Sequence, residues 1–171
     1  MIRIIGGYYK HRLINQPSLE TTRCTKDIAK EGLFNSLGDI SDLSFLDLFS
    51  GSGAVGIEAF SRGASHVVLN EKDKNAKRII MSNLISLAIN DIKVYGLDAN
   101  DCIKELSSLN ESFDIIFLDP PYKDVVLDNI EVNGIKAIKT DTFNYEITVI
   151  INFIVFLNFT HTNNHILLNI F

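Results

Sequence analysis

The sequence predicts a single α/β domain built around a mostly parallel, doubly wound sheet. Short apolar runs typical of buried strands alternate four times with amphipathic stretches of helical period. A glycine-rich turn directly follows the first strand of this alternating series, as expected where a parallel strand leads into a helix. With 171 residues, of which 46% are hydrophobic, the chain can build one core and has no length for a second full domain.

The individual elements follow from the period of the apolar residues and from the positions of glycine. The first helix is expected at residues 26–37, between Thr25 as N-cap and Gly38 as a stop. Further helices are expected at 54–63, 74–88 and 99–110, and strands at 44–49, 65–71, 92–98 and 113–118.

The C-terminal segment 126–171 has an atypical composition, with no Lys or Arg from residue 140 onward. Residues 125–138 predict a further helix and turn, and the apolar run 147–159 predicts one or two buried sheet strands. The alternative for this run is an improperly packed or sequence-shifted tail. Its 13 residues are too few for a bilayer span, which needs roughly 20.

Charge is distributed unevenly along the chain. The net charge is −5, but residues 1–30 carry six basic and two acidic residues, a net of +4, which leaves −9 for the rest. We therefore divide the domain into a basic N-terminal arm (1–25), a core (26–125) and the C-terminal segment (126–171). The arm is expected to contact a phosphate-bearing polymer, because cations displace counterions from polyanions; the alternative is an ordinary solvated surface. The expected contacts are Arg3, Lys10, Arg12, Arg23 and Lys26.

The glycine-rich turn indicates a cofactor that contains adenosine. Gly51, Gly53 and Gly56 form a GxGxxG pattern between a strand and a helix, where free backbone N–H groups can approach a ligand. A merely tight turn is the alternative. Glu71 ends the next strand, 20 residues beyond Gly51, at the position where a carboxylate accepts ribose hydroxyls.

Two further acids favour S-adenosylmethionine over a nicotinamide cofactor. Asp47 lies in the first strand of the sheet, where a negative charge suits a methionine ammonium or sulfonium and not a diphosphate. Asp98 ends the third strand and can receive an adenine amino group, cap the next helix, or do both. For Asp47 the alternative is a carboxylate that caps backbone N–H groups. The expected cofactor residues are Asp47, Phe49, Gly51, Ser52, Gly53, Glu71, Lys72, Asp98 and Ala99.

The sequence DPPY ends the fourth strand and predicts methylation of an exocyclic amine. Such an amine is a poor nucleophile, and Asp119 and the Pro120 carbonyl can each accept one of its N–H groups so that its lone pair points at the methyl group. Pro121 fixes the backbone, and Tyr122 offers a ring on which an extruded base can stack. This chemistry needs no metal, and the two cysteines, Cys24 and Cys102, do not have the spacing of a zinc site.

These motifs resemble the RsmD family, the bacterial guanine-N2 methyltransferases of small-subunit ribosomal RNA. The similar stretches are RIIGGYYKHRL, TRCTKDIAKEGLFNSLGD, FLDLFSGSGAVGIEAFSRGASHVVLNEKD and FDIIFLDPPYKD, in the family's order, over about residues 1–125. Residues 126–171 depart from the family. The resemblance implies a Rossmann-like class I methyltransferase with a basic N-terminal extension, S-adenosylmethionine as donor, and a guanine in 16S ribosomal RNA or an assembling small subunit as acceptor.

Other functions stay open at this point. DPPY also serves DNA adenine-N6 methyltransferases, although the chain has no room before Tyr122 for an inserted recognition domain. A non-catalytic RNA-binding or assembly relative with a defective C-terminus is the alternative outside the enzymes. We expect a cytoplasmic protein, because the N-terminus lacks a secretory signal and the cysteines do not form a disulfide framework. We also expect a monomer with no membrane segment.

Overall fold

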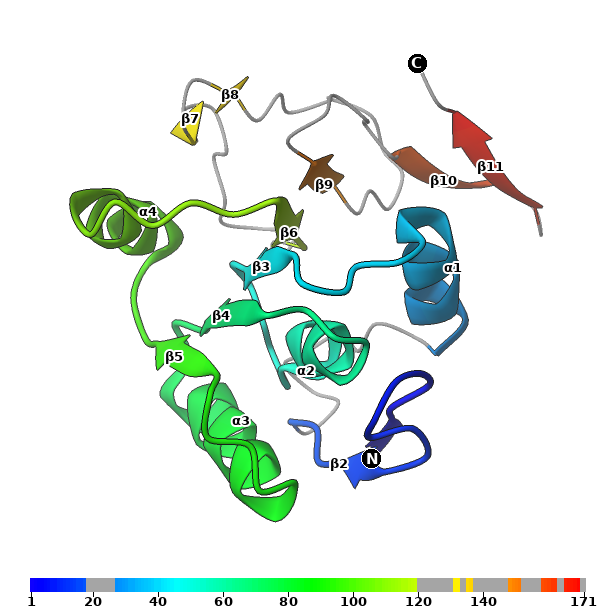
Figure 1. The fold of residues 1–171 in the computed structure, drawn as a ribbon, viewed down its shortest axis with the longest axis horizontal. Helices are drawn as coiled ribbons and strands as arrows, with labels where there is room; N and C mark the ends of the chain where they lie inside the picture. Colours follow the sequence, from blue (N-terminus) through cyan, green and yellow to red (C-terminus); the bar gives the residue numbers. More distant parts are fainter. Residues whose placement is uncertain are drawn as a thin grey trace.

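The computed structural model describes residues 1–17 and 27–119, and five short C-terminal strands at the level of the backbone. Its main sheet has the strand order β5–β4–β3–β6–β9 (Figure 1). The strands are β3 (Ser44–Asp47), β4 (His66–Asn70), β5 (Lys93–Tyr95), β6 (Ile115–Leu118) and β9 (Thr148–Ile151). The first four are parallel and β9 runs antiparallel to β6. The mostly parallel, doubly wound sheet is therefore confirmed, with the reversal of strand order between β3 and β6.

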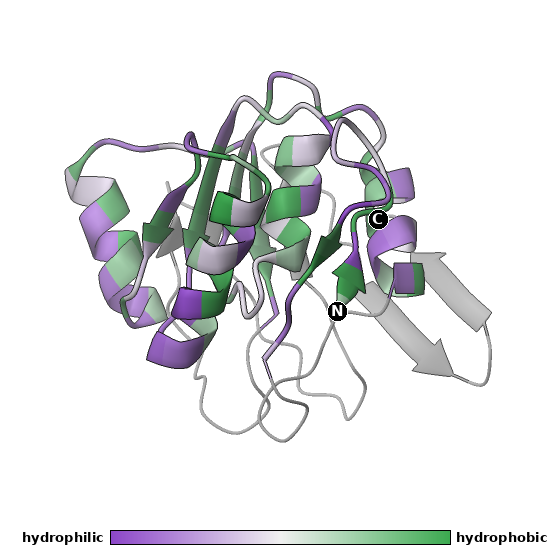
Figure 2. Cartoon of the chain, turned by 90° about the horizontal axis from the view of Figure 1, so that it is seen from below, coloured by the Kyte–Doolittle hydropathy of each residue, from purple (hydrophilic) through white to green (hydrophobic). Residues whose placement is uncertain are grey.

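Helices cover both faces of this sheet (Figure 1). Helices α1 (Asp27–Leu37), α2 (Ala54–Ser61) and α3 (Lys74–Ser86) contribute to one apolar cluster, and α4 (Ala99–Ser108) contributes to a second. Alternate residues of β3, β4 and β6 enter the two clusters: Phe45 and Phe117 face the first, and Leu46 and Leu118 face the second. Because both faces of these strands are covered by apolar side chains, their sequences are continuous hydrophobic runs. Figure 2 shows these strands as the apolar centre of the molecule.

The N-terminal arm is folded onto the core. Strands β1 (Ile2–Arg3) and β2 (Leu13–Ile14) pair antiparallel, and Ile4 is buried in the same cluster as α1 and α2. The backbone N–H groups of Ile5 and Gly6 donate to the buried carboxylate of Glu58 on α2. The arm's position is thus fixed by α2.

The expected phosphate contacts of the arm are only partly described. Arg3, Lys10 and Arg12 are exposed, whereas Arg23 and Lys26 lie outside the described residues. Lys30, one of the basic residues in the charge count of residues 1–30, is fully buried and lies 3.4 Å from Glu58. It contributes nothing to a basic surface.

The C-terminal strands correct one expectation. The helix predicted within 125–138 is wrong where the chain is described, because β7 (Glu131–Val132) and β8 (Ile135–Lys136) pair as antiparallel strands. Between them the sequence has Asn133–Gly134, the dipeptide most favoured in two-residue hairpins, and this signal outweighs the helical period. The apolar run 147–159 contains β9, which is confirmed as a strand of the main sheet. The end of this run begins β10 (Asn158–Thr162), which pairs with β11 (His165–Asn169) in a separate sheet.

Most other elements are shorter than predicted. The strand expected at 44–49 ends at Asp47, and the one expected at 92–98 covers only Lys93–Tyr95. The helix expected at 54–63 ends at Ser61, since Gly63 adopts a left-handed φ of 100°. Within the described residues, the structure contains no helix of the length and apolar character that crossing a membrane requires.

Candidate cofactor and methyl-transfer site

The carboxyl edge of the parallel strands brings the predicted acids to one side of the sheet. Asp47 ends β3 and lies in register with Leu69 of β4 and Phe117 of β6. Glu71 and Asp119 follow those neighbouring strands at once, and the charges of both act on Asp47. Asp47, Glu71 and Asp119 meet there because the parallel topology places the carboxyl ends of all these strands at one edge.

The three glycines of the turn have two different roles. Gly51 and Gly53 have positive φ angles of 54° and 78°, which glycine adopts without the strain of a Cβ atom. The N–H of Gly53 donates to the Ser50 carbonyl at 2.7 Å and closes the turn before α2. Gly56 instead packs α2 against β4, because a Cβ there would collide with the Leu69 side chain. Only the first two shape the turn between β3 and α2.

Asp47 has the capping role that the sequence left open, while its role in cofactor binding stays a prediction. One carboxyl oxygen, Oδ2, accepts the backbone N–H of Gly56 at 3.2 Å, as a capping carboxylate does. The other, Oδ1, is buried and has no hydrogen-bond partner among the described residues. Burial, reinforced by the charges of Asp119 and Glu71, raises the pKa of Asp47 to about 8 despite the Gly56 hydrogen bond. A buried, unpartnered carboxyl oxygen beside two other acids fits a cationic ligand group.

Glu71 holds the glycine loop as well as facing the sheet edge. Its Oε2 accepts the N–H of Gly51 at 2.7 Å, and its Oε1 accepts the N–H of Asp73 at 2.8 Å. Each oxygen keeps one lone pair for a further donor. Burial raises the pKa of Glu71, although the two backbone N–H groups oppose that shift. Ribose binding by Glu71 stays a prediction.

Asp98 caps α4, as one of the two sequence readings expected. Its side chain accepts the N–H of Asn100 at 3.2 Å, and it pairs with Lys72 at 3.0 Å. These contacts, the one to Lys72 first, hold the pKa of Asp98 below its usual range. Ala99 is the first residue of α4 and packs with Phe49 against the second apolar cluster.

Asn70 is a site residue that the sequence prediction missed. Its buried side chain donates to the carbonyls of Leu48 (3.2 Å) and Leu97 (3.0 Å) and accepts the N–H of Leu97 (3.1 Å). Its backbone exchanges hydrogen bonds with Ser50 in the glycine turn. Asn70 thus joins the ends of β3, β4 and β5. A polar residue closing the apolar run VVL, directly before Glu71, was the available signal.

Of the remaining predicted site residues, the structure describes Ser52 and Asp119. Ser52 is buried, and its carbonyl accepts from Asn83 of α3 at 3.1 Å. Asp119 directly follows β6 and is partly exposed. Pro120, Pro121 and Tyr122 lie outside the described residues. No group of three His, Cys, Asp or Glu side chains suited to a metal ion occurs in the part of the chain that the structure describes.

The fold and this edge define the class of protein, a Rossmann-like α/β methyltransferase. The solved structure of a putative methyltransferase from Escherichia coli, yhhF, is 35% identical, with a TM-score of 0.62 over 74% of this chain and 67% of its own. Its similarity in both sequence and fold supports the assignment.

The family is defined by sequence. The family described as "Conserved hypothetical protein 95" matches residues 2–151. The Bacillus subtilis protein named "Putative rRNA methyltransferase YlbH" is 39% identical over 125 residues, which cover 72% of this chain and 68% of the relative. "Ribosomal RNA small subunit methyltransferase D" of Escherichia coli K12 is 36% identical over 138 residues, which cover 78% and 68%. The chain belongs to this family, the RsmD family that its motifs resemble.

Proposed function

We propose that this protein methylates small-subunit ribosomal RNA with S-adenosylmethionine as donor, at the exocyclic N2 amine of a guanine. The observation that carries the proposal is the meeting of Asp47, the glycine loop and Glu71 beside Asp119 at one sheet edge. The first three suit an adenosine-containing cation, and the fourth suits an amine acceptor.

The residues present fit S-adenosylmethionine. Asp47 offers a buried oxygen without a protein partner in the described part of the chain, which a methionine ammonium or sulfonium would satisfy. Glu71 keeps lone pairs for ribose hydroxyls, and Asp98, three residues beyond the neighbouring strand β5, is assigned to the adenine amino group. The cofactor supplies a methyl group made electrophilic by a positively charged sulfur.

Asp119 is assigned to the acceptor amine. Its carboxylate accepts one N–H of the amine, so that the nitrogen lone pair is directed at the methyl group while positive charge develops on nitrogen. In the overall transfer one N–C bond forms, one S–C bond breaks, and the amine loses one proton. As predicted from the sequence, the Pro120 carbonyl is assigned to the second N–H of the amine and the Tyr122 ring to stacking on the base.

The names of the relatives support the choice of acceptor. Two of them are called ribosomal RNA methyltransferases, one of the small subunit. The guanine N2 position rests on the resemblance of the arm and of the DPPY motif to the RsmD family.

The test is transfer of a radiolabelled methyl group to small-subunit RNA and to small-subunit particles, followed by identification of the nucleoside. We expect N2-methylguanosine. Label in N6-methyladenine of duplex DNA would favour the DNA enzyme instead. Cofactor binding without any transfer, by a protein that retains its fold, would favour the non-catalytic relative.

Glu71→Ala is expected to weaken S-adenosylmethionine binding about tenfold to a hundredfold, or roughly 1.5 to 3 kcal/mol, because two ribose hydroxyls lose their acceptor. Titration calorimetry measures the affinity. The control is Glu105→Ala, which removes an exposed carboxylate of α4. Equal affinities of the Glu71→Ala and Glu105→Ala proteins would remove Glu71 from the site.

Cofactor affinity is expected to rise with pH up to about 8. Without a ligand, Asp47 has a pKa of about 8 and is mostly protonated at neutral pH. A bound cation favours its ionised form and lowers that pKa, so binding releases up to about one proton, and affinity rises by up to about tenfold per pH unit below pH 8. Above pH 8 the rise stops.

The raised pKa of Asp47 also affects folding stability. Between about pH 4 and 8 the folded protein keeps Asp47 protonated while the unfolded chain has lost that proton, so the contribution of Asp47 to folding stability decreases as the pH rises through this range.

Calorimetry in two buffers of different ionisation enthalpy measures this proton release. Asp47→Asn keeps an acceptor for the Gly56 N–H but cannot ionise, so its binding should lose the pH dependence. S-adenosylhomocysteine lacks the positive sulfur and separates a sulfonium contact from an ammonium contact. If Asp47→Asn keeps the wild-type pH dependence, another group is the source.

A further inference from the structure

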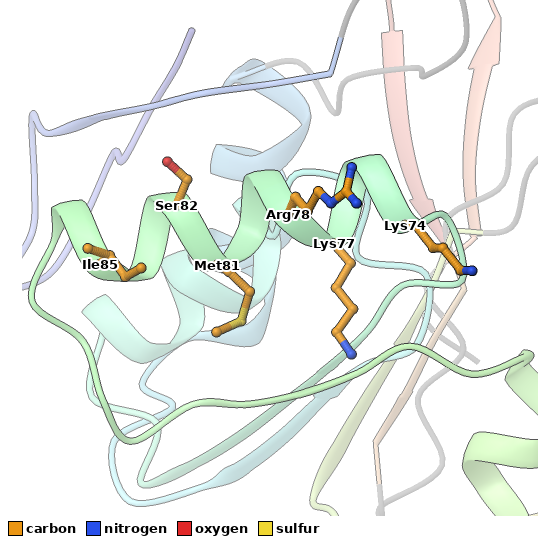
Figure 3. Close-up of a pocket in the computed structure, with 6 residues that line it drawn as sticks. All are labelled: Lys74, Lys77, Arg78, Met81, Ser82 and Ile85. Carbon is orange, nitrogen blue, oxygen red and sulfur yellow. The ribbon is translucent and has the colours of Figure 1, made fainter.

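Helix α3 carries a row of cations on its outward face. Lys74 and Arg78 are exposed and Lys77 is partly exposed, while Ala76, Ile80 and Leu84 are buried on the opposite side. Three positive charges within one turn of helix, about 6 Å along its axis, are unusual on a chain whose net charge is −5. Figure 3 shows the three side chains together over the first half of the helix.

These cations lack the acidic partners that other lysines have. Lys72, Lys93 and Lys104 each pair with a carboxylate, at 3.0, 3.2 and 3.3 Å. Among the described residues, Lys74, Lys77 and Arg78 form no ion pair, and Arg78 donates a hydrogen bond to the side-chain oxygen of Asn75, at 3.5 Å. Their charges are therefore available to an external anion.

Apolar side chains continue the same face. Met81 and Ile85 are 43% and 76% exposed, and together with Ser82 and the three cations they line a surface hollow of about 510 Å³ (Figure 3). Large exposed apolar residues beside a cluster of cations favour a ligand that is both anionic and partly apolar. A single RNA strand has both properties, with phosphates for the cations and a ribose or an unstacked base for Met81 and Ile85.

The helix also connects the two regions that the proposed function uses. It begins three residues after Glu71, at the cofactor edge, and Asp73 caps its first turn. Near its other end, Asn83 exchanges hydrogen bonds with the backbone of Asn15 at 2.8 and 2.9 Å, so this end of α3 is joined to the arm. A strand that lies along α3 would extend from the arm toward the cofactor.

We infer that the face of α3 formed by Lys74, Lys77, Arg78, Met81 and Ile85 is a second RNA-contacting surface, which binds a single-stranded segment of the substrate beside the arm. This inference rests on the proposed function, because it names the substrate of the same site. Phosphate contacts of this kind position an RNA without reading its sequence.

The test compares two double variants that remove the same charge. Lys74→Ala/Lys77→Ala removes unpaired cations of α3, and Lys93→Ala/Lys104→Ala removes lysines that are paired with carboxylates. Binding to small-subunit RNA is measured from low to high salt. We expect the α3 variant to reduce the slope of log affinity against log salt by about 1.4, at about 0.7 for each contact with a single strand. The control variant should leave the slope at the wild-type value.

Further measurements distinguish an RNA-contacting surface from a dimer interface. Ile85→Ser should weaken RNA binding at every salt concentration without changing the slope, since it removes an apolar contact. Cofactor affinity by calorimetry should be unchanged in all these variants, which shows that they are folded. A wild-type slope in the α3 variant overturns the inference, and so does a dimer that Ile85→Ser dissociates while RNA binding is retained.

The arm separates failure of this inference from failure of the proposed function. Replacing Arg3, Lys10 and Arg12 by Ala should also reduce the slope. If the arm variant alone changes it, the proposed function stands and the α3 surface is only a solvated face. If wild-type protein binds no small-subunit RNA under any salt condition, the proposed function itself fails.

Discussion

Asp119→Ala is expected to lower the rate of methyl transfer by about two to four orders of magnitude, or roughly 3 to 5 kcal/mol of transition-state stabilisation. The interaction of the carboxylate strengthens as positive charge develops on the amine, so the loss should appear in turnover and much less in cofactor binding. Single-turnover methylation of small-subunit RNA measures it.

The Asp119 prediction has a graded control. Asn at position 119 keeps one acceptor oxygen and should retain more activity than Ala. Tyr122→Ala should act through the stacked base and raise the RNA concentration that gives half-maximal rate. Wild-type single-turnover rates in the Asp119→Ala protein would show that DPPY is not the catalytic motif and would favour the non-catalytic relative.

Removal of Asp119 should also affect its neighbour. The charge of Asp119 is one cause of the raised pKa of Asp47, after burial. Asp119→Ala and Asp119→Asn both remove that charge, so the pH at which cofactor affinity stops rising should decrease in both. The calorimetric titration described above measures this change and separates it from the loss of turnover.

The sequence was sufficient for the central fold because β3, β4 and β6 are buried on both faces, whereas α1, α3 and α4 are buried on one. Runs such as FDIIFL therefore differ locally from KNAKRIIMSNLISLA, and no distant contact is needed to tell them apart. The prediction failed at residues 131–136, where β7 and β8 are only two residues long and the decisive sequence signal is the dipeptide Asn-Gly at 133–134.

For the site, the sequence identified residues whose placement follows from topology alone. Asp47, Glu71, Asp98 and Asp119 follow or end parallel strands, so a correct strand assignment brings them to one edge. Asn70 was missed because its partners Leu48 and Leu97 lie 22 and 27 residues away in the chain. Whether a polar residue in an apolar run is satisfied depends on such distant groups, and only the folded structure shows them.

Glu58, in the region that joins the arm to the core, shows the same limit of prediction from the sequence. It is an acid within the apolar helix AVGIEAF, and it is fully buried. Its Oε2 accepts from the Ile5 N–H at 2.8 Å and lies 3.4 Å from Lys30 Nζ. Its Oε1 accepts from the Gly6 N–H at 2.7 Å and from Arg62 Nε at 3.0 Å. One carboxylate therefore holds the arm, α1 and α2 together.

Glu58→Ala is expected to destabilise the fold by roughly 3 to 5 kcal/mol, because Lys30 stays buried without its carboxylate and two backbone N–H groups lose their acceptor. At this chain length the melting temperature should fall by roughly 6 to 20 °C. Thermal unfolding measures the loss, and hydrogen exchange at the Ile5 and Gly6 amides shows whether the arm is released first.

Comparison of variants separates this charge network from a simple loss of volume. Glu58→Gln keeps the size of the side chain but should rescue little, because all four groups around the carboxylate are donors and the amide NH₂ must face two of them. Lys30→Met combined with Glu58→Gln removes the stranded cation and should recover part of the stability lost in Glu58→Gln alone. Asp101→Ala, which breaks the exposed pair with Lys104, should change stability by less than about 0.5 kcal/mol. If Glu58→Gln unfolds at the wild-type temperature with protected Ile5 and Gly6 amides, the arm is held by its apolar contacts, and Ile4 and Ile14 become the residues to replace.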